Sequence, residues 1–324
     1  MTTLSPSFVG VDIASKHLDI ALHPQGIHFR VTNNEAGLDA CMERLREHAI
    51  AAVAMEATGG MERLAASRFQ AAGYVVHVLN PRRIYNWRQV VARQAKTDRI
   101  DALLIAEFAA TIPLQQAHVT TAQQRTLRDL AARREQIVIA VTNSKKQLAR
   151  AVVPAIRQSI ERQIAFCKQE TAAIEREMDA IFRQDAILMR QCELLESIPG
   201  IGNISAMLIL AELPEIAFLP PKKLASLVGV APHPLHSGTK TTKARITGGR
   251  SRIRSKCYMM AHGSIVHNPW MRTYAHRLLA RGKSRREVNI ACINKLLHVA
   301  HAVLTRNTTW LTEPPDKKIL TQTA

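Results

Sequence analysis

The sequence predicts an α/β domain followed by a long helical region and a further, mainly α-helical part. Three features support this fold class: three strand-like segments in succession near the N-terminus, two alternations of strand and helix patterns after them, and a stretch from Thr120 to about Arg183 without glycine. Alternating strands and helices are typical of a sheet covered by helices, and a glycine-free periodic stretch is typical of long helices.

The strand-like segments are short and rich in apolar and β-branched residues. Residues 7–13, 18–22 and 27–32 are separated by Lys16-His17 and by Pro24-Gln25-Gly26. Because proline and glycine favour turns, this pattern predicts three consecutive antiparallel strands.

A helix is expected to follow Asn34, a favourable N-cap residue, and to end near His48. Strand patterns at 51–57 and 74–80 then flank a helix pattern at 60–72. These alternations complete an α/β domain with a mixed sheet.

In the glycine-free stretch, apolar residues recur every three or four positions on both sides of Pro154. The spacing predicts two long helices that form a coiled-coil arm or a helical hairpin. A helical bundle packed on its own domain agrees equally well with this spacing.

Beyond Leu194 the pattern changes again. A turn-like SIPGIG segment occupies 197–202, and a segment rich in Gly, Ser and Thr at 232–251 is typical of a loop. Helices are expected at 252–266, 270–281 and 285–306. The predicted parts are the α/β domain (1–118), the helical arm (119–185), the C-terminal domain (186–312) and a loose tail (313–324).

The 324-residue chain carries 44 Lys and Arg against 26 Asp and Glu, a net charge of +18. Residues 1–118 carry 12 basic and 11 acidic residues, whereas residues 186–324 carry 20 and 7. Between Glu215 and Glu287 there are 15 Lys and Arg and no acid. Such a surplus attracts polyanions and releases their counterions, so nucleic acid is the expected partner.

The cysteines are scattered, with no CxxC pair: Cys41, Cys167, Cys192, Cys257 and Cys292. They indicate neither a disulfide framework nor a zinc site. The N-terminus has no basic segment followed by an apolar core, and no run of 18 apolar residues occurs. We therefore expect a cytoplasmic, nucleoid-associated protein that does not span a membrane.

Four acids lie where a mixed sheet could bring them together. Asp12 lies inside the first predicted strand and Glu56 at the end of the fourth, which are neighbours in a ribonuclease-H-type sheet. Asp98 and Asp101 begin a helix and share one of its faces. Four carboxylates could hold two magnesium ions, since magnesium prefers oxygen ligands and two cations about 3.5–4 Å apart stabilise phosphodiester displacement.

Each acid also has a structural interpretation. Asp12 could be hydrogen-bonded at a sheet edge, and Glu56 could end a strand before a turn. Asp98 could be an N-cap, and the negative charge of Asp101 could interact favourably with the helix dipole. Asp19, on the second strand, is interpreted as structural. The joint pattern favours a metal site, because a buried acid in a strand is costly unless it is paired or metal-bound.

Six segments together resemble one known family: VGVDIASKHLDIAL, MEATGG, NPRRI, KTDRIDA, SIPGIG and LHSGTKTTKARITGGRSRIR. In this order, and over nearly the whole chain, they resemble the IS-one-ten family of insertion-sequence transposases, the DEDD transposases. The resemblance implies an RNase H-like (RuvC-like) N-terminal α/β domain, a long helical coiled-coil insertion and a mainly α C-terminal transposase domain. The implied activity is that of a transposase or site-specific DNA recombinase.

The family's site residues map onto this chain position by position. Its four acids correspond to Asp12, Glu56, Asp98 and Asp101, with Mg²⁺ as the implied cofactor, and its C-terminal serine corresponds to Ser237. The resemblance implies that the serine attacks DNA and forms a phosphoserine intermediate. It also implies donor and target DNA as substrates, a structured bridge RNA as guide, and dimers that assemble into tetramers with composite sites.

Without the resemblance, Ser237-Gly238-Thr239 is an ordinary turn sequence. Its context favours a phosphate-binding surface, because several basic residues follow without a nearby acid: Lys240, Lys243, Arg245, Arg250, Arg252 and Arg254. A solvated basic face is the alternative. No general base for Ser237 is evident, and His233 and His236 are candidates only by their proximity in sequence.

SIPGIG resembles a helix-hairpin-helix turn, in which Gly200 and Gly202 would let backbone N–H groups approach a phosphate. A tight turn between packed helices has the same sequence pattern. Four aromatic residues near basic ones could stack on bases or pack in a core: Tyr85, Trp87, Trp270 and Tyr274.

Three other functions agree with part of the sequence. A RuvC-like nuclease would use the same acids with water in place of Ser237. A kinase of the actin or sugar-kinase type shares a strand like VGVDIAS, but the second glycine-rich phosphate turn that it requires is not found here. A non-catalytic nucleic-acid-binding protein does not account for four metal-compatible acids, which would repel phosphate.

Overall fold

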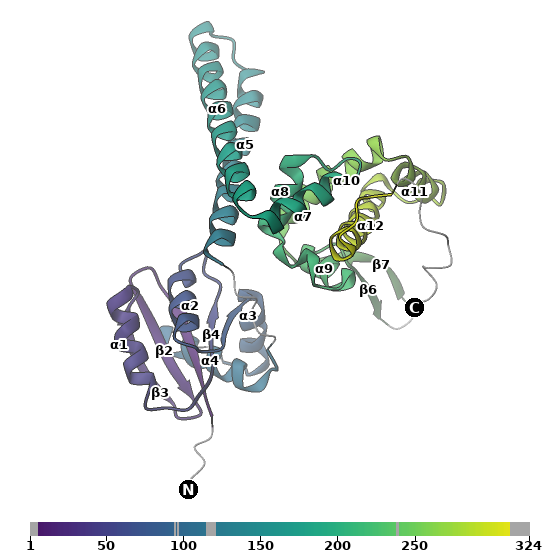
Figure 1. Ribbon diagram of the computed structural model, residues 1–324. Helices are drawn as coiled ribbons and strands as arrows, with labels where there is room; N and C mark the ends of the chain where they lie inside the picture. Colours follow the sequence, from purple (N-terminus) through teal and green to yellow (C-terminus); the bar gives the residue numbers. More distant parts are fainter. Residues whose placement is uncertain (1–5, 94, 96, 115–120, 238–239, 312–324) are drawn as a thin grey trace. The chain divides into compact units, whose positions relative to one another are not determined.

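The computed structural model describes residues 6–311 except 94, 96, 115–120 and 238–239, and for residues 234–244 it describes no side chains. The chain divides into two compact units, Met1–Val119 and Thr120–Ala324. The first unit carries the larger of the two sheets, and the second is mainly helical (Figure 1).

The first unit contains a five-stranded sheet with the order β3-β2-β1-β4-β5. Its strands are β1 (Ser7–Ile13), β2 (His17–His23), β3 (Ile27–Thr32), β4 (Ile50–Glu56) and β5 (Val76–Leu79). Strand β2 is antiparallel to both β1 and β3, whereas β4 is parallel to β1 and β5 is parallel to β4. The predicted three antiparallel strands and mixed sheet are therefore confirmed.

Helices cover both faces of this sheet (Figure 1). They are α1 (Glu35–Leu45), α2 (Glu62–Ala71), α3 (Pro81–Val90) and α4 (Asp98–Thr111). The Asn34 side chain accepts a hydrogen bond from the Gly37 N–H, which confirms it as the N-cap of α1. The N-cap of α4 is Thr97, so the interpretation of Asp98 as a cap is wrong. Asp98 is the first residue of α4, and its carboxylate has another partner, described below.

The alternation of side chains along the strands separates two apolar layers. Val9 and Val11 of β1 pack with residues of α1 and α2, such as Leu38 and Phe69. On the other face, Ala54 of β4 packs with residues of α3 and α4. Because successive strand residues point to opposite faces, Asp12 and Glu56 share the face covered by α4.

The second unit begins with two long helices, α5 (Ala122–Leu148) and α6 (Pro154–Gln184), which lie side by side as a helical hairpin (Figure 1). Their facing sides bury Leu127, Ile137 and Met178, and Arg134 Nε donates to Glu175 Oε1 at 2.7 Å. Pro154 occupies the first turn of α6, where its missing N–H removes no helical hydrogen bond. The two predicted long helices are confirmed.

The rest of the second unit is mainly helical. It comprises α7 (Ala186–Glu196), α8 (Asn203–Glu212), the short 3₁₀ helix η1 (Pro214–Ala217), α9 (Pro221–Val228), β6 (Pro232–Ser237), β7 (Lys240–Ile246), α10 (Ser251–His267), α11 (Pro269–Ala280) and α12 (Arg285–Arg306). The loop expected at 232–251 is wrong over most of its length, because β6 and β7 form an antiparallel pair there. The glycines of this segment lie at 238 and 248–249, outside both strands, so they do not prevent pairing.

Among the described helices, α12 alone has the length and apolar composition of a membrane span. Its apolar residues are core residues, since Cys292, Ile293 and Leu297 are all buried in the large cluster of the second unit. Core packing therefore accounts for its composition.

Candidate functional site

Strand register places a row of charged residues across three neighbouring strands. Asp12 of β1 is directly opposite Asp19 of β2, and Asp19 is directly opposite Arg30 of β3. On the other side of β1, Val11 pairs with Met55, so Asp12 and Glu56 are the next residues along two parallel neighbours. The carboxyl ends of β1 and β4 thus carry Asp12 and Glu56 on one face, next to Asp19 near the start of β2.

Gly10 lets α4 cross β1 at backbone contact distance. A Cβ atom at this position would overlap the carbonyl oxygen of Ala102 and the backbone nitrogen of Ala106. The first turn of α4, with Asp98 and Asp101, therefore comes close to Asp12, two residues beyond Gly10. Glycine at this position is required by close packing of a helix on a strand.

Burial and the neighbouring carboxylates raise the pKa of Asp12 to about 6. Burial has the largest effect, and the negative charges of Asp101, Asp98, Asp19 and Glu56 follow in that order. A carboxyl group surrounded by like charges resists ionisation unless a cation balances it. All four acids predicted from the sequence are thus close enough to interact electrostatically.

Two arginines partly balance this charge. Arg30 Nε and Nη2 both donate to the buried carboxylate of Asp19, and Nη2 also donates to Asp98 Oδ2 at 2.7 Å. Arg88 donates to Asp101 Oδ1. The histidine ring of His28 lies 2.9 Å from Asp19 Oδ1.

The loop after Glu56 is ordered by a carboxylate of α2. Glu62 accepts hydrogen bonds from the backbone N–H groups of Thr58 and Gly60, each at 2.9 Å. Gly59 and Gly60 both have positive φ angles, of 67° and 107°. The TGG part of the MEATGG segment therefore forms the turn that follows Glu56 and leads into α2.

Sequence reasoning missed several members of this cluster. The structural interpretation of Asp19 agrees with its burial and its ion pair, but through Arg30 this residue is also linked to Asp98. His17, Asp19 and Asp98 each offer a ligand atom, and these atoms lie within 4.8 Å of one another. The predicted hairpin between 7–13 and 18–22 contained the signal, because a turn at 14–17 sets Asp12 opposite Asp19.

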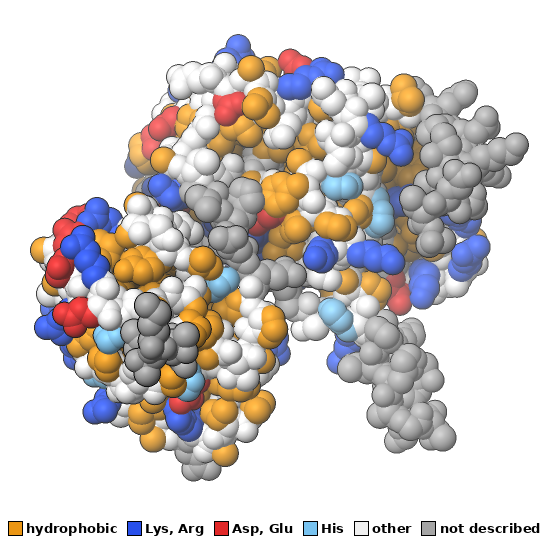
Figure 2. All heavy atoms as spheres, turned by 60° about the horizontal axis from the view of Figure 1, so that its bottom comes forward, with side chains coloured by type: hydrophobic (Ala, Val, Ile, Leu, Met, Phe, Trp, Pro, Cys, Tyr) orange, Lys and Arg blue, Asp and Glu red, His pale blue; other side chains and the backbone are white. Residues whose placement is uncertain are grey.

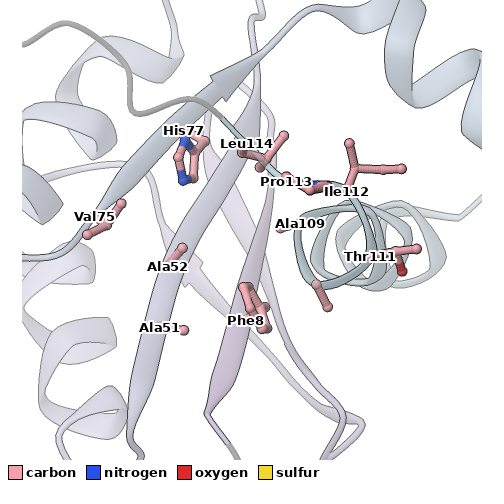
Figure 3. Close-up of a pocket in the computed structure, with 11 residues that line it drawn as sticks. Phe8, Ala51, Ala52, Val75, His77, Ala109, Thr111, Ile112, Pro113 and Leu114 are labelled. Atoms are coloured by element: carbon pink, nitrogen blue, oxygen red, sulfur yellow. The ribbon is translucent and has the colours of Figure 1, made fainter.

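A pocket of about 330 Å³ lies at the opposite end of the sheet (Figure 3). Phe8, Ala52 and His77 from the strands line it, together with Thr111 and Ile112 at the end of α4. Phe8 is near the start of β1, whereas Asp12 is near its end. This largely apolar pocket is therefore distinct from the carboxylate cluster.

Ser237 is the last residue of β6, and its backbone pairs with Lys240 of β7. Gly238 and Thr239 lie outside the described residues, as do the side chains of Ser237, Lys240 and Lys243. The serine therefore stands at the tip of a β-hairpin in the second unit, while the four acids belong to the first.

Three of the predicted phosphate-binding arginines have partners within the protein. Arg250 forms a two-point ion pair with Glu215, at 2.6 and 2.8 Å. Arg252 pairs with Glu135 of α5 and Glu212 of α8. Arg254 donates to the carbonyl oxygens of Val228, Gly229 and Gly248. Arg245, by contrast, is exposed at the end of β7.

The SIPGIG segment joins α7 to α8. Gly200 has a φ of 98°, and a Cβ atom there would overlap the backbone of Ser264 in α10. Gly202 is the N-cap of α8, with open space around it. Gly200 is thus required by packing between helices, while Gly202 lies at an open helix N-terminus.

The aromatic residues divide between core and surface. Trp87 packs edge-on against Phe108 in the first unit, whereas Tyr85 is exposed. Trp270 stacks on Tyr274, with their ring centres 6.4 Å apart, and Lys295 Nζ lies over the Trp270 ring, 5.4 Å from its centre. On the face drawn in Figure 2, Lys and Arg side chains are spread among apolar and uncharged ones rather than gathered in one patch.

Comparison with known proteins gives a consistent result over both units. Residues 9–155 match the DEDD family of IS110 elements, described as "Transposase", and residues 192–276 match "Transposase IS116/IS110/IS902 family". The pilin gene-inverting protein of Moraxella bovis is 25% identical over 334 aligned positions, covering 98% of this chain and 99% of that protein.

Two shorter matches are to proteins of insertion elements. The IS900 uncharacterized 42 kDa protein of Mycobacterium paratuberculosis is 30% identical over 190 positions, 55% of this chain and 46% of that protein. The IS110 uncharacterized 43.6 kDa protein of Streptomyces coelicolor is 25% identical over 166 positions, 51% of this chain and 39% of that protein. The chain therefore belongs to the IS110 family of transposases, enzymes that cut and join DNA.

Proposed function

We propose that this transposase uses a divalent-metal site in a RuvC-like domain, formed by Asp12, Glu56, Asp98 and Asp101. The strand order β3-β2-β1-β4-β5, with its parallel and antiparallel pairs, agrees with a ribonuclease-H-type sheet. The observation that carries the proposal is the convergence of four carboxylates from β1, β4 and α4 on one face of that sheet.

The residues present are suited to magnesium. All four side chains offer oxygen ligands, which Mg²⁺ prefers, and their mutual repulsion is relieved by a cation. When bound, such an ion would stabilise negative charge on the oxygens of a phosphodiester that is being cut or joined.

The four acids differ in what each can do. Asp12 is fixed within β1, and its carboxyl group interacts with all three of the other acids, so it would anchor the ion. Asp98 is more than half exposed at the start of α4, on the side from which a DNA strand could approach. Asp101 is held by Arg88, which sets the position of its carboxylate.

We propose Ser237 as the nucleophile for strand cleavage. Its hydroxyl oxygen would bond to phosphorus while one P–O bond of the phosphodiester breaks, which releases a DNA hydroxyl and leaves a phosphoserine linkage. Attack by a DNA hydroxyl on that linkage would rejoin a strand and restore the serine. Its place at a hairpin tip, with Lys240 as its backbone pairing partner on β7, supports access to a phosphate.

Because Ser237 and the acids belong to different units, we propose that the complete site is composite and draws its halves from different subunits of a dimer or tetramer. We further propose that a structured bridge RNA guides donor and target DNA to this site. The family membership and the net charge of +18 support nucleic-acid partners of this kind.

The test uses the full-length protein and a plasmid that carries the element with its flanking DNA and RNA-coding region. Recombined junctions are counted by sequencing for the wild type, Asp12→Asn and Ser237→Ala. We expect both variants to lose at least 100-fold in junction formation while retaining nucleic-acid binding, a loss typical of a removed catalytic group. Glu43→Gln, in an exposed ion pair of α1, serves as the matched control. Normal recombination by either site variant would exclude the proposal.

A RuvC-like nuclease that uses water is the second candidate, because the four acids occupy a unit that does not contain Ser237. The two mechanisms differ in their intermediate. A covalent protein–DNA adduct that disappears in Ser237→Ala supports the serine mechanism. Cutting by Ser237→Ala at the wild-type rate, with no adduct in either protein, supports the nuclease.

A further inference from the structure

Arg30 bridges two carboxylates that differ sharply in exposure. Its Nη2 atom lies 2.8 Å from Asp19 Oδ2 and 2.7 Å from Asp98 Oδ2. The Asp19 side chain is 4% exposed, whereas that of Asp98 is 56% exposed. One cationic group is thus shared between a buried acid and an exposed one.

The contact with Asp19 is the more durable of the two. Arg30 Nε also donates to both oxygens of Asp19, at 3.2 and 3.0 Å, and the strand pairing holds the two residues opposite each other. A buried carboxylate that lost the arginine would keep the contact with the His28 ring but lose its guanidinium counter-charge, which is strongly unfavourable. An exposed ion pair such as Arg30–Asp98 contributes little by comparison.

Arg88 provides the contrast within the same cluster. It pairs with Asp101 where both side chains are largely buried, at 14% and 16% exposure. Its Nη1 atom also donates to the carbonyl oxygen of Ala95 at 2.9 Å. Arg88 is therefore fixed at two points, and the Arg30–Asp98 contact is the one that can be exchanged.

Arg30 Nη2 also lies beside three side chains that could bind a metal ion. His17, Asp19 and Asp98 present a nitrogen and two carboxylate oxygens within 4.8 Å of one another, and Nη2 contacts two of these side chains. Such an arrangement stabilises a cation, and the guanidinium supplies one from the protein itself.

We propose that Arg30 is a placeholder for the divalent ion at Asp98: it pairs with this carboxylate in the metal-free protein and releases it when the ion binds, while remaining paired with Asp19. This inference rests on the proposed metal site. Arg30 would then keep the first turn of α4 in place against the repulsion of the carboxylates until the ion arrives. It is a positioning residue that competes with the metal.

The test measures Mn²⁺ binding directly, from the electron paramagnetic resonance signal of free Mn²⁺ titrated into full-length protein. If Arg30 competes with the ion, Arg30→Gln should bind Mn²⁺ at least threefold more tightly than the wild type. Arg46→Gln, which removes an exposed arginine paired with Glu43 on α1, should bind as the wild type does. Unchanged or weaker binding by Arg30→Gln overturns the inference.

A second variant separates misfolding from the loss of competition, since Arg30→Gln leaves the buried Asp19 carboxylate with the His28 ring but without its arginine. The double variant Asp19→Asn, Arg30→Gln removes both charges of that pair and should retain the tighter binding. Its counterpart Asp19→Asn, which keeps Arg30, should not bind more tightly than the wild type, because the guanidinium is then free to pair with Asp98 alone. Tighter binding by Asp19→Asn alone would contradict the placeholder role.

Failure of this inference is distinguishable from failure of the proposed function. Wild-type binding that is abolished by Asp12→Asn, together with no gain in Arg30→Gln, removes only the placeholder. Mn²⁺ binding that Asp12→Asn leaves unchanged, or no binding by any of these proteins, removes the carboxylate metal site and the placeholder with it.

Discussion

The two units each contain a group of acidic residues, but the charge of these groups is balanced differently. In the first unit, Arg30 and Arg88 pair with Asp19, Asp98 and Asp101, yet the pKa of Asp12 stays raised to about 6. In the second unit, three acids meet three cations: Glu135, Glu212 and Glu215 with Arg250, Arg252 and Lys256.

These three acids of the second unit, each paired with a basic side chain, form a balanced group that stabilises the fold. Burial would raise the pKa of Glu215, but its hydrogen bonds with Arg250 lower it below the ordinary value. This group ties α5, α8 and α10 together, because Glu135 and Glu212 share Arg252 and Lys256. Acids that are each paired with a basic side chain thus stabilise the fold. Acids that outnumber their basic partners repel one another, and a bound metal cation can relieve that repulsion.

Gly10→Val should have the largest effect on the carboxylate cluster of the first unit. The added side chain overlaps the backbone of α4, so either α4 shifts away from β1 or the unit unfolds. We expect a loss of at least about 3 kcal/mol in unfolding free energy and the loss of Mn²⁺ binding. Chemical denaturation and metal titration measure the two effects. Gly202→Ala, where a Cβ meets open space, should cost less than about 1 kcal/mol. A Gly10→Val protein of wild-type stability would show that close packing does not set the cluster.

Glu215→Gln tests the balanced group. Because the pKa of Glu215 is lowered, its ionised form contributes stability at neutral pH, and this contribution is lost as the pH falls through 4.5 and then through the folded-state value. We expect a cost of about 2 kcal/mol at pH 7, with a smaller difference near pH 4. Glu193→Gln, in an exposed pair with Arg190, should change stability by less than about 0.5 kcal/mol. A cost for Glu215→Gln that is independent of pH would contradict the ion-pair explanation.

Much of the first unit could be predicted from the sequence, because its signals are local. Alternating apolar residues defined the strands, and Asn34 marked the start of α1. The convergence of Asp12 and Glu56 followed from neighbouring strands. Arg88 could not be predicted as a partner of Asp101, since that contact depends on how α3 packs against α4 and not on sequence spacing.

The second unit was harder to predict because its charged residues are partners across long sequence separations. Arg250 and Arg252 stand in a run of basic residues that is typical of a phosphate-binding surface, yet they pair with Glu215 and Glu212. An acid that lies more than 30 positions away leaves no signal in a local charge count. The hairpin of β6 and β7 is not predicted by composition, because β6 contains two prolines and no β-branched residue, and only β7 carries the Thr and Ile residues typical of strands.

Asp12→Asn should change the unfolding free energy in the opposite direction from Glu215→Gln. The folded-state pKa of Asp12 is about 6 and its ordinary value is 3.8, so ionised Asp12 destabilises the metal-free protein above pH 6. Below pH 3.8 the residue is protonated in both the folded and unfolded states and the effect vanishes. We expect Asp12→Asn to raise stability at pH 7 by about 1 kcal/mol, allowing for solvent screening, with a gain that shrinks between pH 6 and pH 4. Melting in the presence of a chelator measures this; a lower stability at pH 7 would reject the repulsion.

The smallest effects are expected for the exposed and the internally paired arginines of the same basic segment. Arg245→Gln removes an exposed charge, so binding to a duplex of random sequence should weaken a few-fold and the slope of log affinity against log salt should fall by about 1, with stability unchanged. Arg254→Gln removes hydrogen bonds to three carbonyl oxygens, so it should lower stability by about 1 kcal/mol and leave the salt slope of the folded protein unaltered. Fluorescence anisotropy over a salt series measures the binding of both. If Arg254→Gln changed the salt slope as Arg245→Gln does, internal pairing would not separate structural arginines from phosphate-binding ones.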